Sequence, residues 1–148
     1  MGIISDTHGR ITESALNALA GSELIIHAGD IGEKDVLEKL KSIAPVFPVK
    51  GNMDKGAWAR GIPGSETVNH GCVSLYILHD ISRIDLDPAA SGFSAVIFGH
   101  THKPFIDRQN GVLFVNPGSA TQPRSNHPPS VALLTVTGGF LEARLVIL

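Results

Sequence analysis

The stretch IIHAGDIG (residues 25–32) joins a strand to a carboxylate, and the meaning of this junction decides how the fold is interpreted. Residues 24–26 are apolar and typical of a buried strand, yet the chain continues through Gly29 directly to Asp30. Asp30 alone fits the N-cap of a following helix. It also fits a site to which several strands contribute. The ends of the other strands discriminate between these two interpretations.

The first third of the chain alternates short apolar strands with amphipathic helices. Strands are expected at residues 2–5, 23–27 and 46–50, and helices at residues 11–21 and 33–43. Such an order predicts right-handed crossovers and a parallel sheet.

The remainder of the chain is rich in strands, which are expected at residues 66–71, 72–79, 94–100, 104–109, 112–116, 130–137 and 140–148. Asn110-Gly111 and Gly138-Gly139 predict hairpin turns, and residues 87–93 have room for little more than two helical turns. No repeat or linker divides the sequence. We therefore expect a single domain over residues 1–148, built from two stacked sheets of mixed strand direction with helices outside.

Size and composition restrict the class of protein. The chain has 148 residues, 43% of them apolar and 18% charged, which is typical of a soluble globular domain. Its net charge of −2 gives no general footprint for nucleic-acid binding. We expect neither a secretory leader nor a membrane span, and a cytoplasmic location. Cys72 is the one cysteine, which excludes an intrachain disulfide, and we expect it to be buried in its strand.

Five predicted strands end in aspartate, asparagine or histidine. The residues at these ends are Asp6, His8, Asp30, Asn52, Asp54, His79, His100 and His102. Taken singly, each has an ordinary explanation as a turn residue, a helix cap or a core histidine. Taken together they predict a site, because the carboxyl ends of strands form the ligand-binding edge of an open α/β sheet. His27, inside its strand, and His127, in a proline-rich loop, are left outside it.

The side chains at these strand ends are those of a metal site. Carboxylate and amide oxygens with imidazole nitrogens suit divalent transition metals, and the lack of thiolates excludes a structural zinc site of the cysteine type. Seven such ligands are too many for one ion. They suit two ions that share a bridging carboxylate, an arrangement with ions ~3.5–4 Å apart that is typical of phosphoester hydrolysis.

The motifs SDTHG, HAGD, GNMD, LH, GHTHKP and NPGS occur in this order from the first strand to about Arg124. In this the chain resembles the calcineurin-like metallophosphoesterases, and most of all the small bacterial and archaeal phosphodiesterases of that superfamily. The resemblance implies a four-layer αββα sandwich of two mixed sheets flanked by helices. It also implies that one ion is bound by Asp6, His8 and His102, the other by Asn52, His79 and His100, and that Asp30 bridges them.

Three features depart from the family pattern. Met53 stands where the larger phosphatases carry a histidine, and small members often lack that histidine too. Asp80 stands where the family commonly has glycine. The segment 80–93 is short, so we expect a stunted helix there and an altered substrate mouth.

The resemblance implies a metal-dependent phosphodiesterase that uses a bridging hydroxide. Two divalent ions contribute +4 and Asp6 and Asp30 contribute −2, so the remaining positive charge lowers the pKa of bridging water. Asn52 and His79 are assigned to the catalytic centre, with Asp54 orienting a histidine or water from behind. Arg10 and Arg124 are candidate phosphate partners, although each also fits an ordinary surface arginine. We expect Mn²⁺, with Fe, Zn, Ni and Mg as alternatives.

Two other functions fit the same fold. A metallophosphoesterase-like subunit of the retromer coat uses it as a scaffold that binds proteins, and lost ligands would favour that function here; all seven positions are filled. A nuclease would share the chemistry, but the composition lacks a basic groove. The expected partner is therefore a small phosphoester, with a homo-oligomer as an open alternative.

Overall fold

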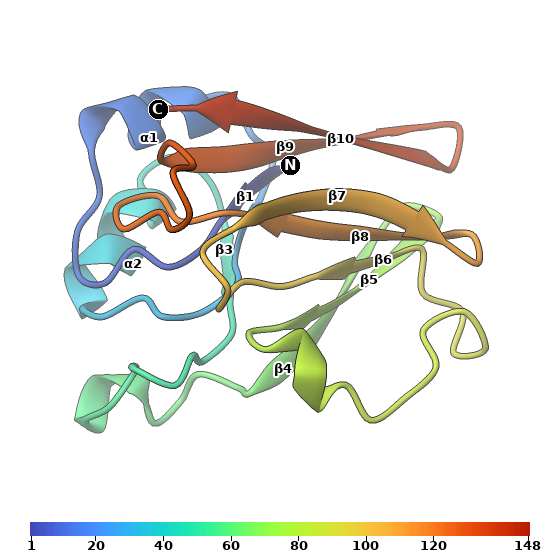
Figure 1. The fold of residues 1–148 in the computed structure, drawn as a ribbon, viewed down its shortest axis with the longest axis horizontal. Coiled ribbons are helices and arrows are strands. Elements are labelled where there is room, and N and C mark those ends of the chain that lie inside the picture. Colours follow the sequence, from blue (N-terminus) through green and yellow to red (C-terminus); the bar gives the residue numbers. More distant parts are fainter.

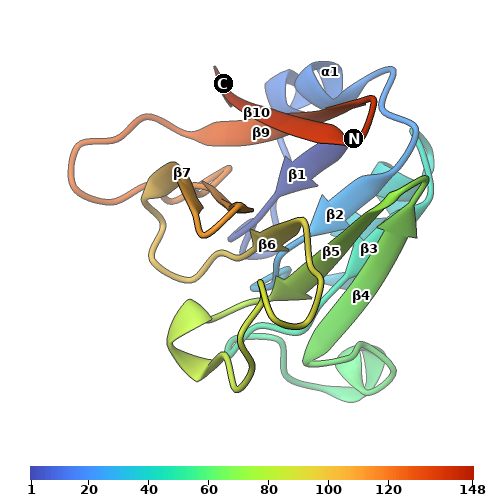
Figure 2. The same ribbon diagram turned by 90° about the vertical axis from the view of Figure 1, so that its right-hand side faces the viewer.

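Two five-stranded mixed sheets form the body of the protein, and a computed structural model describes all 148 residues. Sheet A has the strand order β10-β9-β1-β2-β3, with the bounds β1 Gly2–Ile4, β2 Ile25–His27, β3 Val46–Pro48, β9 Ser130–Thr137 and β10 Phe140–Ile147. Sheet B has the order β4-β5-β6-β8-β7, with the bounds β4 Ser65–His70, β5 Val73–Leu78, β6 Ala95–Ile97, β7 Pro104–Gln109 and β8 Val112–Pro117. Figures 1 and 2 show the two sheets stacked face to face. This confirms the expected α/β sandwich.

Sheet A is parallel over β1, β2 and the edge strand β3 and antiparallel on its other side, whereas sheet B is parallel at its centre and antiparallel at both edges. In sheet A, β1 pairs in parallel with β2, and β2 with β3, while β9 runs antiparallel to β1. In sheet B, β5, β6 and β8 are parallel and the edge strands β4 and β7 are antiparallel. Parallel pairing requires crossovers, which α1 (Glu13–Leu19) and α2 (Lys34–Lys41) supply in sheet A. The loops after β1 and β2 consequently start from the same edge of sheet A.

The two helices cover the outer face of sheet A (Figure 1). Thr12 begins α1 by accepting a hydrogen bond from the backbone N–H of Ala15, whereas Glu33, which begins α2, makes no such side-chain bond. Leu19 and Leu40 pack against Ile4 and Ile25 of sheet A. Neither helix is long and apolar enough to cross a membrane.

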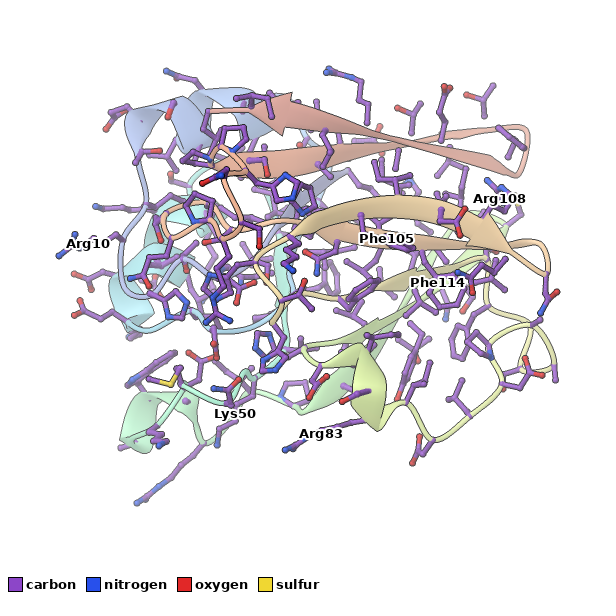
Figure 3. The ribbon with its side chains drawn as sticks, in the orientation of Figure 1. Arg10, Lys50, Arg83, Phe105, Arg108 and Phe114 are labelled. Atoms are coloured by element: carbon purple, nitrogen blue, oxygen red, sulfur yellow. The ribbon has the colours of Figure 1, made fainter.

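The outer face of sheet B carries a thinner layer than that of sheet A. The 3-10 turn η2 (Ile81–Arg83) and the coil after it cover it, and residues 87–93 form a single turn. The Asp87 carboxylate accepts the N–H groups of Ala89 and Ala90, and Gly92, at φ 79°, ends the turn before a helix can extend. Phe105 and Phe114 lie on this face, and Phe105 is 42% exposed (Figure 3).

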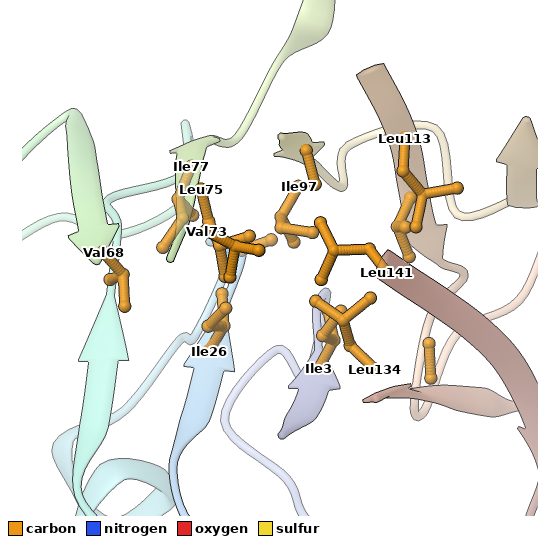
Figure 4. Packing of buried hydrophobic residues seen from close by; sticks show 14 of the residues in the cluster. Ile3, Ile26, Val68, Val73, Leu75, Ile77, Ile97, Leu113, Leu134 and Leu141 are labelled. Carbon is orange, nitrogen blue, oxygen red and sulfur yellow. The ribbon is translucent and has the colours of Figure 1, made fainter. Parts of the chain in front are cut away.

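The main core lies between the sheets. Ile3 and Ile26 of sheet A face Leu75 and Ile77 of sheet B, and all four side chains are fully buried (Figure 4). Strand alternation selects these inward positions. Cys72 corrects our expectation: it is exposed, because the chain turns at residues 71–72 and β5 begins at the next residue. With the interior closed by aliphatic packing, polar side chains gather at the strand ends.

Candidate metal centre

One group of predicted ligands converges at the ends of β1, β2 and β6. The ligand atoms of Asp6, His8, Asp30 and His102 all lie within 4.8 Å of one another. The Nε2 atom of His102 is 3.2 Å from Oδ1 of Asp6 and 3.3 Å from Nε2 of His8. Residues separated by up to 96 positions in the sequence therefore surround one point, at a distance suited to a shared cation.

A second group adjoins the first through Asp30. Nδ1 of His100 lies 3.1 Å from the side-chain oxygen of Asn52, and the rings of His79 and His100 are 5.1 Å apart, edge to face. Oδ2 of Asp30 lies 3.5 Å from Nε2 of His79, while Asp30 also belongs to the first group. The structure thus brings all seven predicted ligands to one place, with the Asp30 carboxylate between the two groups.

Asp30 does not cap α2, which begins at Glu33. Its Oδ1 instead accepts the backbone N–H of Met53 at 2.8 Å, which connects the β2 loop to the loop after β3. The N-cap interpretation of Asp30 is therefore excluded, and the carboxylate faces the histidines.

The protonation pattern of two histidines leaves lone pairs facing negative oxygen. Nδ1 of His79 lies 2.7 Å from the carbonyl of Ala28 and must donate to it, and Nδ1 of His102 likewise donates to the carbonyl of Gln122. In a neutral ring each Nε2 is then an acceptor, and it faces a carboxylate oxygen of Asp30 or Asp6. Oδ1 of Asp6 and Nε2 of His79 are buried with no hydrogen-bond partner. Acceptors aimed at acceptors need a cation between them, so the donor set fits metal ions.

Without ions, protons occupy the same positions. Asp6 and the Gln122 carbonyl outweigh burial and raise the pKa of His102 above its usual value. Burial opposes protonation of His79, but Asp30 and the Ala28 carbonyl outweigh it and raise that pKa too. Burial also works against the charged form of Asp30, yet His79 and the Met53 N–H outweigh it and lower its pKa. The carboxylate therefore stays ionised and holds positive charge next to it.

Backbone strain is concentrated at the ligands. Eight residues other than glycine have positive φ, and five of them belong to the seven predicted ligands: Asp6, His8, Asp30, His100 and His102. Such left-handed conformations cost of order 1–3 kcal/mol each and persist only where surrounding contacts enforce them. The loops are therefore held in position against their own backbone preference, which is characteristic of functional sites.

Two glycines allow the close approach of these groups. A Cβ atom on Gly51 would lie 2.1 Å from Oδ1 of Asp30, and one on Gly99 would lie 1.9 Å from Oγ of Ser5. Neither position tolerates a side chain without displacing a ligand or its support.

Asp54 acts on backbone rather than on a histidine. We expected it to orient a histidine or water, but its buried oxygens accept the N–H groups of Gly32 and Gly51, each at 2.8 Å. It thereby fixes the loops that present Asp30 and Asn52.

Residues 116–119, which we expect from the NPGS motif to form the turn beside the metals, support the ligand loops, as does Thr121, which no motif indicated. Ser119 and Thr121 donate to the Asp6 carbonyl, and Asn116 donates to the Gly99 carbonyl at 2.8 Å. The NPGS motif that contains Asn116 and Ser119 was the available signal. His27, which we left outside the site, is fully buried and hydrogen-bonds to the loops on both sides of it.

The predicted substrate contacts lie at different places. Arg124 is exposed but close enough to His102 to oppose its protonation. Arg10 is exposed at the edge of the molecule and points away from it (Figure 3). Asp80 was not assigned a role; its Oδ2 lies 3.9 Å from Nε2 of His100.

A cavity of about 710 Å³ opens beside the second group of ligands, and His79, His100 and Asn52 line it. Its other charged residues are Lys50, Arg83, Asp80 and Asp85. Most of the residues that line the cavity are polar, and it gives a small molecule access to the ligands.

Comparison with known proteins identifies relatives over nearly the whole chain. The family model for the calcineurin-like phosphoesterase superfamily domain matches residues 1–139. A protein of Methanothermobacter thermautotrophicus named probable metallophosphoesterase is 34% identical over 158 aligned residues, covering 99% of this chain and 91% of the relative.

Two solved structures show the same fold. A structure described as a novel archaeal phosphodiesterase has a TM-score of 0.83 at 24% identity, covering 99% of this chain and 98% of that one. Vps29 of Entamoeba histolytica, complexed with Zn²⁺, has a TM-score of 0.77 at 23% identity, covering 99% and 97%.

Proposed function

The chain belongs to the calcineurin-like phosphoesterase superfamily, a family of hydrolases acting on phosphoester bonds, and we propose that it hydrolyses phosphodiesters at a dinuclear metal centre. In this proposal Asp6, His8 and His102 hold one ion, Asn52, His79 and His100 hold the other, and Asp30 bridges them. When bound, two divalent ions would supply hydroxide near neutral pH and would balance the charge of the phosphate. The preferred metal is Mn²⁺, because oxygen and imidazole ligands without thiolate suit it.

The observation that carries this proposal is that lone pairs of two histidine nitrogens face lone pairs of carboxylate oxygens. The Nε2 atoms of His79 and His102 face carboxylate oxygens at 3.5 and 3.2 Å while their Nδ1 atoms are committed to carbonyls. A neutral histidine with a purely structural role would instead place Nε2 against a hydrogen-bond donor. Asp54 and the Met53 N–H hold the surrounding loops, so the ligand positions are fixed before any ion binds.

The charge of the substrate and the lack of a proton donor at Met53 favour a diester with a good leaving group. A diester carries one negative charge and a monoester two, and the extra charge opposes attack by hydroxide. Met53 is 54% exposed beside the ligand loops and has no proton to give to a departing alkoxide. A positioned general acid is worth roughly 10²–10⁴-fold. Substrates with good leaving groups, such as aryl diesters, should therefore be cleaved best.

Arg124 is proposed as a phosphate contact, because it lies near His102.

Reconstitution with Mn²⁺ tests the proposal. Elemental analysis should find two ions per chain, and bis(p-nitrophenyl) phosphate should be hydrolysed faster than p-nitrophenyl phosphate. Asp30→Asn keeps the shape of the side chain but removes its charge, so it should lose both activity and bound metal. Asp107→Asn, on the exposed strand β7, is the matched control and should lose neither. At most one ion per chain, with none lost in Asp30→Asn, would refute the dinuclear centre.

A protein-binding scaffold is the second candidate, since Vps29 has the same fold. The cavity of about 710 Å³ that opens onto His79, His100 and Asn52 favours the enzyme, because a scaffold needs no space for a substrate beside its metal ligands.

A further inference from the structure

A second cavity, of about 540 Å³, shares Asn52 with the first. It has no apolar lining residue, and its charged side chains are Lys50, Lys55, Arg60 and Asp54. Lys50, Gly51 and Asn52 line both cavities, so the two spaces adjoin at a proposed metal ligand.

The charge of this cavity is opposite to that of the protein. Three cations and one carboxylate give residues 50–60 a formal charge of +2, so the rest of the chain, within a total of −2, carries −4. The single carboxylate, Asp54, is fully buried and already accepts two backbone N–H groups. Lys50, Lys55 and Arg60 form no ion pair within the chain. Three cations next to the metal ligands therefore lack an anion.

The segment that carries these cations is fixed rather than loose. At its base, the N–H of Lys50 donates to the carbonyl of Pro63 at 2.7 Å. The 3-10 turn η1 (Ala57–Ala59) places Trp58 against the packed residues of α2, and Ala59 is fully buried. Lys55 and Arg60 flank η1, so both cations are presented from an anchored turn.

The first cavity does not offer the same environment. There Lys50 and Arg83 are accompanied by Asp80 and Asp85, and Asp80 is within 3.6 Å of Arg83. The two cations and two carboxylates of the first cavity balance, so this cavity suits an uncharged polar part of a substrate. An additional anion is repelled there by two carboxylates, Asp80 and Asp85, whereas the one carboxylate of the second cavity, Asp54, is buried and already accepts two backbone N–H groups.

We propose that the second cavity is a subsite for an additional phosphate group, so that the preferred substrate is a phosphodiester carrying a further phosphate outside the scissile bond. This inference rests on the proposed phosphodiesterase activity. Arg60 can pair with phosphate through two parallel N–H groups, and Lys50 and Lys55 contribute point charges. The additional phosphate lies away from the reacting phosphorus, so the subsite binds it equally well in the bound substrate and in the transition state. Such uniform binding lowers KM and leaves kcat unchanged.

A pair of substrates that differ only in the second phosphate tests the subsite. One is the p-nitrophenyl ester of thymidine 5′-phosphate, and the other is the same ester with a 3′-phosphate added. Water adds to the 5′ phosphorus and p-nitrophenolate leaves in both. The Mn²⁺-loaded protein should show a KM about tenfold lower for the 3′-phosphorylated ester, the factor that corresponds to about 1.4 kcal/mol. In Lys55→Gln/Arg60→Gln, which keeps only Lys50, most of this difference in KM should be lost.

A charge-matched control separates local binding from general attraction. Lys39→Gln/Lys41→Gln removes the same charge from the last turn of α2, at the opposite edge of sheet A from the ligand loops. It should keep the tenfold difference in KM. If both double variants reduce the difference equally, the effect is long-range attraction and the subsite does not exist.

Calorimetry distinguishes failure of the subsite from failure of the proposed function. The Mn²⁺-loaded protein should bind thymidine 3′,5′-bisphosphate about tenfold more tightly than thymidine 5′-phosphate, and the Lys55/Arg60 variant should not. Absence of turnover with this binding difference retained would refute the phosphodiesterase and keep the subsite. Turnover of both esters with equal KM and equal binding would refute the subsite alone.

Discussion

His27 and Thr7 are joined by a 2.9 Å hydrogen bond next to the proposed metal ligands. The direction of this bond follows from its neighbours. The N–H of Gly29 donates to Nδ1 of His27, so Nε2 carries the proton and donates to the Thr7 hydroxyl, which in turn donates to the carbonyl of Ile31. Thr7 lies between two ligands of the β1 loop, and Ile31 follows Asp30. One neutral imidazole thus fixes the two loops relative to each other.

This arrangement predicts an acid-sensitive contribution to stability. Burial lowers the pKa of His27 to about 4, against an ordinary value of 6.5. Because the folded pKa is depressed, the unfolded chain binds the proton more readily, so the stabilisation is complete above about pH 6.5 and is lost as the pH falls towards 4. The shift corresponds to about 3 kcal/mol. Chemical denaturation of metal-free protein should show that His27→Gln flattens the fall in unfolding free energy between these pH values. His127→Gln, in an exposed loop, should leave it unchanged; parallel curves for His27→Gln and the wild type would contradict the assignment.

Protons and metal ions should compete at His79 and His102. Their pKa values are raised in the metal-free protein, so these rings stabilise the fold below about pH 6.5 and lose that contribution as the pH rises through the folded values. The same protons occupy Nε2, where an ion would bind. The rise in melting temperature caused by Mn²⁺ should therefore be larger near pH 8 than near pH 6. Differential scanning calorimetry with Mn²⁺ or with EDTA measures it, and an increment independent of pH would show that neither ring binds metal.

Gly51→Ala should displace Asp30. The added Cβ would lie 2.1 Å from its Oδ1, so the carboxylate or the loop must move, at a cost of roughly 1–3 kcal/mol. Gly61→Ala is the control, because nothing lies within 4 Å of a Cβ there and its φ is not positive. We expect Gly51→Ala to lower the melting temperature and to lose bound Mn²⁺, with Gly61→Ala unaffected. Retention of two ions per chain by Gly51→Ala would place Asp30 outside the centre.

His100→Ala should affect catalysis far more than stability. The His100 side chain is 43% exposed, so its removal leaves no buried cavity. Melting of the metal-free variant should stay close to that of the wild type, while kcat/KM with Mn²⁺ falls at least roughly 100-fold, as expected from losing a metal ligand. His79→Ala should cripple turnover as well, but its ring is buried and a larger loss of stability is expected. Failure of metal-free His100→Ala to fold would make this histidine structural.

Met53→His should help only poor leaving groups. A histidine at this exposed position can protonate an alkoxide, worth roughly 10²–10⁴-fold where the leaving group needs it. The comparison is kcat/KM for an alkyl diester and for bis(p-nitrophenyl) phosphate, in the variant and in the wild type. A gain confined to the alkyl diester supports the argument. A wild-type enzyme that cleaves both diesters equally fast would reveal another general acid.

Strand ends were predictable because their signal is local. An apolar run followed by Asp30 or His79 is visible in a few residues. Because parallel strands end at the same edge of a sheet, these residues are then expected to lie close together. The left-handed backbone at Asp6 and the bond between Thr7 and His27 depend on tertiary contacts, so no local pattern contains them. Cys72 is a different case: Val73, Leu75 and Ile77 alternate inward, which already placed Cys72 on the opposite face.

The left-handed ligand residues also bear on how such a protein evolves. Five ligands occupy conformations that glycine would adopt without strain, so exchanging one for glycine relieves about 1 kcal/mol or more once no ion is needed. Backbone strain alone would therefore favour glycine at these positions, and the side chains persist through the contacts that they make. The seven proposed ligand positions are therefore expected to stay filled only while a bound ion offsets this backbone cost.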